Sequence, residues 1–159
     1  ITAIMATVLA LAAPAMAQAA TPDGTHSFEG TLEVRKGLPL WTTCDVIANV
    51  NVTGGSPKLQ SVTLSGSSVC DGISFTVPTN AVLNTASLPL VTVPSVGITI
   101  AFPAGTCAGD LNLYWGGNSA TPRSLTFADG ASNLPGSGLG LPCRIKGTLT
   151  QTSTPAVSL

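Results

Sequence analysis

The sequence predicts an all-β fold: a single antiparallel β-sandwich or barrel-like domain of about eight or nine short strands, disulfide-linked and preceded by a signal peptide. Short stretches of alternating apolar and polar residues recur along the chain, and turns containing Gly or Pro separate them. No amphipathic helical pattern follows residue 17, and the four cysteines are an even number that can cross-link strands in pairs.

The clearest strand covers residues 41–52. Apolar residues occupy every second position and share one face of an extended chain: Cys44, Val46, Ala48, Val50 and Val52. Asp45, Asn49 and Asn51 fall on the opposite face, and only Ile47 breaks the alternation. This pattern is typical of a half-buried central strand onto which other strands can be laid.

Further strands are expected at short intervals, over residues 27–34, 59–65, 73–77, 96–102, 111–115, 124–127 and 143–152. Asp71-Gly72 is a favoured pair for a tight turn, so residues 60–77 are expected to form a β-hairpin. Pro89 and Pro94 lack the backbone N–H that a strand needs, and they are expected to exclude a long central strand from this region.

Two distant segments share a Gly-Thr-Leu core. Phe28-Glu-Gly-Thr-Leu lies near the start of the predicted domain, and Ile145-Lys-Gly-Thr-Leu lies near its end. We expect these first and last strands to be neighbours. Two copies are too few for a repeat architecture, which requires a period that recurs along the chain.

Residues 1–17 are expected to be a signal peptide, truncated at its start, and residues 18–159 a single secreted β domain. Residues 4–17 form an uncharged, alanine-rich run that ends in Ala15-Met16-Ala17, the small-x-small pattern cut by signal peptidase. The alternative, a membrane span, needs about 20 apolar residues, more than this run contains. The processed protein is therefore expected to be secreted or extracellular, with the periplasm as an alternative, and not membrane-spanning.

Charged residues make up only 8% of the chain, against about 25% in an ordinary domain. The six basic residues are scattered along the sequence: Arg35, Lys36, Lys58, Arg123, Arg144 and Lys146. Nucleic-acid binding requires clustered Lys and Arg, so we expect no nucleic-acid partner. The surface is expected to remain hydrated mainly through neutral Ser, Thr and Asn side chains.

The cysteines, Cys44, Cys70, Cys107 and Cys143, are expected to form two disulfides because they follow an export signal. Three connectivities are possible. We favour Cys44 with Cys70 and Cys107 with Cys143, since each joins a strand to the next part of the chain. Each bond would stabilise the fold by roughly 3 to 4 kcal/mol on a chain-entropy estimate. Their spacing lacks the close ligand pairs of zinc sites, so no metal is expected.

Catalytic residues are not apparent in the sequence. His26, the single histidine, lies in a polar lead-in and is expected to be a mobile surface residue, which leaves a hydrolase triad without a base. Asp71 and Asp129 are each followed by Gly and are expected to be turn residues. We therefore expect a non-enzymatic protein without a cofactor.

Three aromatic residues are candidates for a weak binding site. Tyr114 and Trp115 are adjacent and would lie on opposite faces of a strand, so that one of them is exposed. Trp115 is expected in the core and Tyr114 at the surface, and the alternative is an aromatic platform for a sugar or another apolar ligand. Trp41 is open to the same two interpretations.

Several short motifs together resemble one bacterial family, the Pra-type secreted proteins called protein activator of alkane oxidation. They are the signal peptide, a Phe-x-Gly-Thr-Leu first strand, Thr43-Cys44-Asp45-Val46, Leu113-Tyr114-Trp115-Gly116, and Leu141-Pro142-Cys143 before the last strand. The resemblance spans almost all of the mature chain. It implies an exported, non-catalytic accessory protein linked to growth on hydrocarbons and to surface or biofilm behaviour.

Two function classes follow. In the first, the domain acts at an apolar surface such as hydrocarbon, aiding access to alkane or adhesion. In the second, it is a subunit of an extracellular fibre or cell-surface matrix that self-associates by strand exchange. A carbohydrate-binding module is a third, less supported interpretation. A nearly uncharged surface loses few hydrated ionic groups on adsorption, so binding should weaken little in salt.

The predicted cleavage site is directly testable. The mature protein should begin at Gln18, because Ala15 and Ala17 are the small residues that signal peptidase accepts. N-terminal sequencing of the exported protein measures this. An uncleaved chain, or a start before Ala15, would instead favour a membrane anchor.

Overall fold

The computed structural model describes residues 18–37, 39–79, 81–102, 104–137 and 140–159, and the predicted signal peptide, residues 1–17, lies outside them. The described chain forms nine strands and one short helix: β1 (Gly24–Lys36), β2 (Thr42–Thr53), β3 (Ser56–Ser65), α1 (Ser68–Asp71), β4 (Ile73–Thr76), β5 (Asn84–Ser87), β6 (Leu90–Ile100), β7 (Gly105–Trp115), β8 (Ser124–Phe127) and β9 (Cys143–Gln151).

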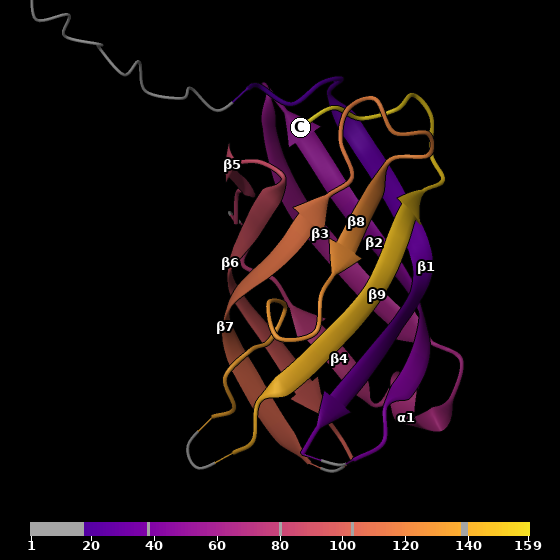
Figure 1. The fold of residues 1–159 in the computed structure, drawn as a ribbon, viewed down its shortest axis with the longest axis vertical. Coiled ribbons are helices and arrows are strands. Elements are labelled where there is room, and N and C mark those ends of the chain that lie inside the picture. The colour runs from indigo at the N-terminus through magenta and orange to yellow at the C-terminus, as the bar shows by residue number, and fades with distance from the viewer. Residues whose placement is uncertain (1–17, 38, 80, 103, 138–139) are drawn as a thin grey trace, which may run out of the picture.

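The strands form one antiparallel sheet that curls into a nearly closed barrel (Figure 1). Its strand order is β3-β2-β1-β9-β8-β7-β6-β4, and β5 pairs with β6 beside this path. The two end strands, β3 and β4, face each other across the remaining seam. Near one end of the seam the backbone N–H of Leu83 donates to the oxygen of Pro57 at 2.8 Å. The predicted all-β, barrel-like fold is confirmed.

The barrel interior is a filled apolar core. The alternation predicted for β2 is observed: Cys44, Val46, Ala48, Val50 and Val52 are buried, and Ile47 is exposed. An internal cavity of only about 20 Å³ remains among the apolar side chains of the core. A barrel of about eight strands is just wide enough for side chains to fill, and here they fill it.

The first and last strands are neighbours, as the shared Gly-Thr-Leu core predicts. In the β1–β9 pair, Gly30 lies opposite Leu149 and Leu32 lies opposite Gly147. The two glycines permit this close approach. A Cβ added to Gly147 would be 2.5 Å from the backbone oxygen of Thr31, and one added to Gly30 would be 2.5 Å from that of Thr148.

The hairpin expected over residues 60–77 is wrong. β4 pairs with β6, not with β3, and α1 lies between β3 and β4 in sequence. Asp71 belongs to α1 and Gly72 forms its C-cap, so this pair ends a helical turn and does not form a hairpin turn. The side chain of Ser67 accepts a hydrogen bond from the N–H of Cys70, which starts the helix in the usual N-cap manner.

The expectation that proline excludes a long strand near residue 94 is also wrong. β6 is 11 residues long, and Pro94 lies within it at a register shift between Val93 and Val96. Ser95 adopts a φ of 55° there, and its N–H donates to the Asp110 carboxylate at 3.0 Å. The bulge removes the need for a proline N–H in the ladder, which is how sheets tolerate proline.

His26 is not a mobile surface residue, which corrects the prediction from its position in the chain. It lies in β1, opposite Val50, and is only 2% exposed. Its Nε2 is 2.9 Å from the backbone oxygen of Pro22, and its Nδ1 is 3.4 Å from the amide nitrogen of Gln151. The extended β1 begins earlier than the alternation suggested, so it includes this residue and turns it inward.

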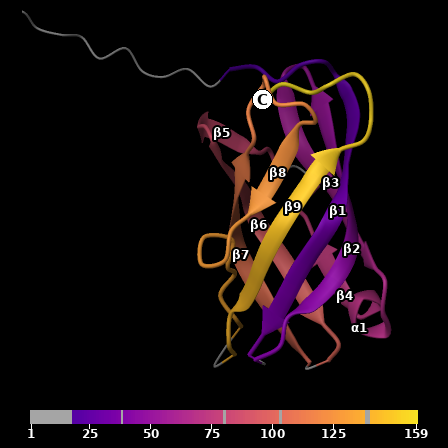
Figure 2. The same cartoon turned by 45° about the vertical axis from the view of Figure 1, so that its right-hand side comes forward.

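Both predicted disulfides and their favoured connectivity are confirmed, and both lie toward one end of the barrel. Cys44–Cys70 joins β2 to α1, and Cys107–Cys143 joins β7 to the start of β9. We call this end, where β1, β3 and β6 finish and β2, β7 and β9 begin, the disulfide end. Figure 2 shows α1 at this end and β5 near the opposite one.

Gly147→Ala tests the close β1–β9 contact. The new Cβ meets the Thr31 oxygen, and Gly147 also has a φ of +138°. Gly24→Ala is the matched control, because Gly24 has a φ of +130° but nothing within 4 Å of its added Cβ. We expect Gly147→Ala to lower the free energy of unfolding by about 1 to 3 kcal/mol more than the control. Equal losses in urea denaturation would show that the close approach is unimportant.

Candidate functional site at the disulfide end of the barrel

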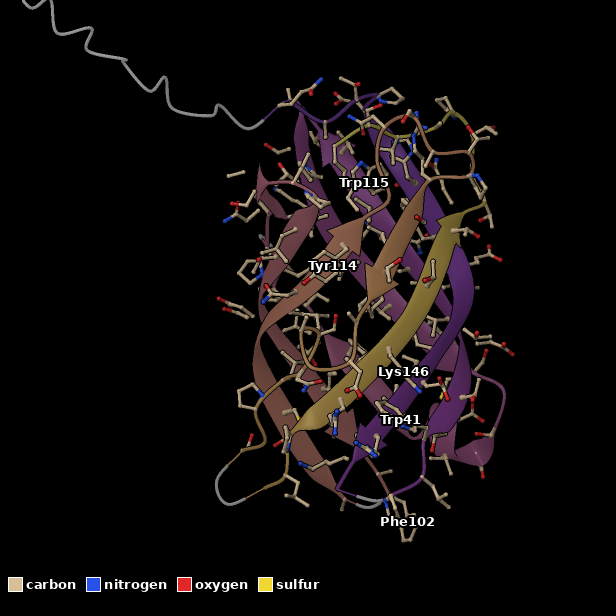
Figure 3. The ribbon with its side chains drawn as sticks, viewed as in Figure 1. Trp41, Phe102, Tyr114, Trp115 and Lys146 are labelled. Carbon is tan, nitrogen blue, oxygen red and sulfur yellow. A yellow bond between two sulfur atoms is a disulfide. The ribbon has the colours of Figure 1, made fainter. Side chains whose placement is uncertain are left out.

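Exposed apolar side chains gather at the disulfide end. Leu40 is 78% exposed, Phe102 is 74% exposed and Leu141 is 58% exposed. They come from three separate connections, before β2, between β6 and β7, and before β9. Figure 3 shows Phe102 at the extremity of the barrel, where its ring projects into solvent. We call Leu40, Phe102 and Leu141 the apolar tip.

A pocket of about 190 Å³ opens beside the apolar tip, and we call it the mouth pocket. Most of its lining is apolar, from Val34, Leu40, Val69, Ile73, Ile100 and Phe102, and the rest comes from Arg35, Lys36 and Thr42. Val34, Ile73 and Ile100 are buried core residues at this end of the barrel interior. The mouths of β-barrels are frequent ligand sites, and this pocket is far larger than the cavity of about 20 Å³ deeper in the core.

Basic side chains surround Trp41 next to the apolar tip. The Arg35 guanidinium carbon lies 4.5 Å from the centre of the Trp41 ring, the Lys146 ammonium lies 4.4 Å from it, and the Arg144 guanidinium lies 5.9 Å from it. The β1–β9 register produces this group, because Arg35 lies directly opposite Arg144. Such cation–π contacts fix the half-buried indole against the outer wall of the barrel.

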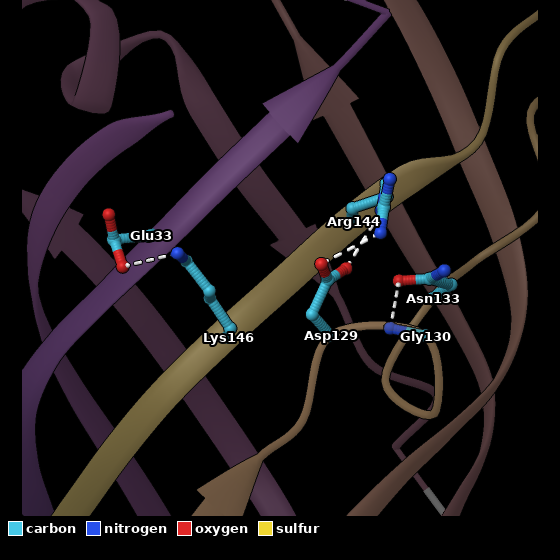
Figure 4. Close-up of polar contacts among 6 residues, drawn as sticks. All are labelled: Glu33, Asp129, Gly130, Asn133, Arg144 and Lys146. Atoms are coloured by element: carbon cyan, nitrogen blue, oxygen red, sulfur yellow. Dashed lines mark hydrogen bonds and ion pairs between the residues drawn. The ribbon is translucent and has the colours of Figure 1, made fainter. Parts of the chain in front are cut away.

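Two of these cations are neutralised by carboxylates (Figure 4). Arg144 donates to both oxygens of Asp129, at 2.8 Å and 2.7 Å, and the Lys146 ammonium lies 3.1 Å from Glu33. Asp129, expected only as a turn residue, thus also holds a guanidinium. Arg35 forms no salt bridge with any described carboxylate.

Lys36 points toward the mouth of the barrel. Its ammonium donates to the backbone oxygen of Leu141 at 2.6 Å and lies 3.7 Å from the sulfur of Cys107. It therefore tethers the Leu141 segment to the end of β1. An ammonium has three donors, so this contact leaves it able to bind a further acceptor.

The aromatic residues selected from the sequence do not form one surface. Trp115 is only 4% exposed, packs edge-on against Phe28, and donates its Nε1–H to Asn118 at 2.9 Å. Its predicted core position is confirmed, and Tyr114 is exposed as expected. Figure 3 shows Tyr114 and Trp115 far from Trp41 along the barrel. A platform that combines all three is therefore not present.

The sequence did not reveal the basic group or the apolar tip. Arg35 and Lys36 are separated from Arg144 and Lys146 by more than one hundred residues, yet four of the six basic residues meet at the disulfide end. Their apparent scatter disappears because β1 and β9 pair. The Gly-Thr-Leu sequence shared by β1 and β9 could have revealed the group. Pairing the two copies and extending the register along both strands places Arg35 opposite Arg144.

Among the residues that the structure describes, no group of three or more His, Cys, Asp or Glu side chains could hold a metal ion. No helix within the described residues has the length and apolarity of a membrane span. His26 lies near the opposite end of β1 from Arg35.

Comparison with known proteins assigns the chain to a family. A family model described as alkane oxidation protein activator PraA/PraB-like matches residues 1–159, which is the whole chain. No curated protein and no solved structure matches it. The chain therefore belongs to the PraA/PraB-like family of alkane oxidation protein activators.

Proposed function

We propose that the protein is a secreted, non-catalytic accessory factor of alkane oxidation that adsorbs to apolar interfaces through the disulfide end of its barrel. The family is named for activation, which supports an accessory role. The two disulfides support an oxidising, extracytoplasmic compartment. The observation that carries the proposal is the apolar tip, where three large side chains from separate connections are exposed together.

Burial of the apolar tip supplies the favourable free energy of adsorption. Removing a Leu or Phe side chain from water contributes roughly 1.5 to 3 kcal/mol. Three such side chains offer about 5 kcal/mol before the loss of translational freedom is subtracted. Among the charged residues nearby, Arg144 and Lys146 are already paired with carboxylates, which lowers the cost of approaching an apolar phase.

The disulfides support the proposal because they fasten the segments next to the tip. Cys70 holds α1, which carries Val69 of the mouth pocket, against β2. Cys143 follows Leu141 by two residues and is bonded to β7. An adsorbing surface that is already ordered loses less conformational entropy on binding.

The filled interior favours adsorption over transport inside the barrel. The described core leaves a cavity of about 20 Å³, which is close to the space of one water molecule. A hydrocarbon chain would have to displace core side chains to enter it. Contact with alkane is therefore expected at the outer end of the barrel and not within it.

A matrix subunit remains the second candidate, and the seam of the barrel is the feature that favours it. In the described sheet, the strands with an unpaired edge are β3 at one end and β4 and β5 at the other. Strand exchange with another molecule would have to occur at these edges. Size-exclusion chromatography at several concentrations separates this function from adsorption. Concentration-dependent oligomers without droplet binding would favour the matrix role.

The double variant Leu40→Ser with Phe102→Ser tests the proposal. We expect adsorption to bare hexadecane droplets to fall about tenfold or more, because two exposed apolar side chains are lost from the tip. Adsorption is measured from the protein left in solution after the droplets are removed. High salt should change wild-type binding little, since hydrophobic attraction is not screened.

The control replaces two exposed apolar residues away from the tip, Ile47→Ser with Leu88→Ser. Ile47 is 46% exposed and Leu88 is 37% exposed, less than the two tip residues, and their replacement should leave adsorption at the wild-type level. The proposal would be wrong if both double variants adsorbed equally. Wild-type protein that did not adsorb at all would also contradict it.

A further inference from the structure

The mouth pocket combines an apolar wall with two cations at its rim. The wall includes Val34, Ile73, Ile100 and Phe102, and Arg35 and Lys36 also line the pocket. A hydrocarbon has no charge with which to bind these cations, and a small inorganic anion has no apolar surface to bury against the wall. The pocket therefore fits a molecule with both an alkyl chain and an anionic head group.

Arg35 lies where such a head group would be placed. It lines the mouth pocket and also an adjoining open groove of about 410 Å³, whose other members include Pro39, Leu141 and Arg144. Its guanidinium stacks over Trp41, which holds the side chain in position without using its hydrogen-bond donors. The planar fork of Arg matches carboxylate and phosphate geometry.

The local charge balance favours an anion. Near the mouth pocket, Glu33 pairs with Lys146 and Asp129 pairs with Arg144, whereas Arg35 and Lys36 form no salt bridge within the described chain. Asp45 on β2 and Asp71 on α1 are the other carboxylates toward this end, and both are exposed. Neither forms a salt bridge in the described chain, so neither neutralises the two cations directly.

We propose that the disulfide end recognises anionic amphiphiles displayed on a hydrocarbon surface, with the alkyl chain at the mouth pocket and the head group at Arg35 and Lys36. This inference rests on the proposed function, because the same end of the barrel must face the interface. Complete oxidation of a terminal alkane carbon gives a long-chain carboxylate, which is an amphiphile of this class. Oxidation would thus generate a surface to which the protein binds more tightly.

The experiment compares adsorption to hexadecane droplets that are bare, coated with oleate under mildly alkaline conditions, or coated with zwitterionic phosphatidylcholine. We expect the wild-type protein to prefer the oleate coat. This preference should shrink as salt rises from about 0.01 M to about 1 M, because the Debye length falls from about 30 Å to about 3 Å. A single cation near an anionic surface contributes about 1 kcal/mol, so Arg35→Gln should weaken oleate binding about fivefold.

Lys58→Gln is the matched control, since it removes the same charge from β3 near the opposite end of the barrel. It should retain the preference for oleate, and Arg35→Lys should retain most of it because the positive charge remains. Thermal unfolding of each variant establishes that it is folded. The wild-type salt titration tests the inference without any variant.

The possible failures are distinguishable. Absence of a preference for oleate, or equal losses in Arg35→Gln and Lys58→Gln, would overturn this inference and leave the adsorption proposal intact if bare droplets still bind the protein. Absence of binding to bare droplets would contradict the proposed function itself.

Discussion

The pairing of β1 with β9 is the contact on which the rest of the structure depends. It joins the beginning and the end of the domain and unites β3-β2-β1 with β9-β8-β7-β6-β4 in the single sheet that curls into the barrel. Gly30 and Gly147 make it possible, because a side chain at either position would meet the backbone oxygen of the other strand. The same register places Arg35 opposite Arg144 and Glu33 opposite Lys146. One strand pairing therefore assembles both the continuous sheet around the core and the group of charges around Trp41.

Closure of the barrel separates the two roles of its apolar residues. Inward side chains of the described residues fill the interior, and the cavity among them measures about 20 Å³. The three most exposed large apolar side chains of the described residues, Leu40, Phe102 and Leu141, lie at the disulfide end. The two disulfides order this end, so stability and the proposed adsorption depend on the same cross-links.

The sequence predicted the features that depend on the local alternation of apolar and polar residues and on the number of cysteines. The buried face of β2, the all-β class, the core position of Trp115 and both disulfides were predicted correctly. The errors arose where tertiary contacts override a local rule. A bulge accommodates Pro94 within β6, and the extended β1 buries His26. The candidate site was missed because its tip lies in connections without periodicity, and its cations become neighbours only through the β1–β9 register.

The orientation of the protein on hydrocarbon is the central claim, and its two tryptophans report on it directly. Trp41 lies beside the apolar tip, whereas Trp115 is buried far along the barrel (Figure 3). Droplets that contain 1-bromohexadecane quench the fluorescence of nearby indoles, so the measurement compares the wild type with Trp41→Phe. We predict strong quenching in the wild type and almost none in Trp41→Phe. Equal quenching of the two proteins would contradict adsorption through the disulfide end.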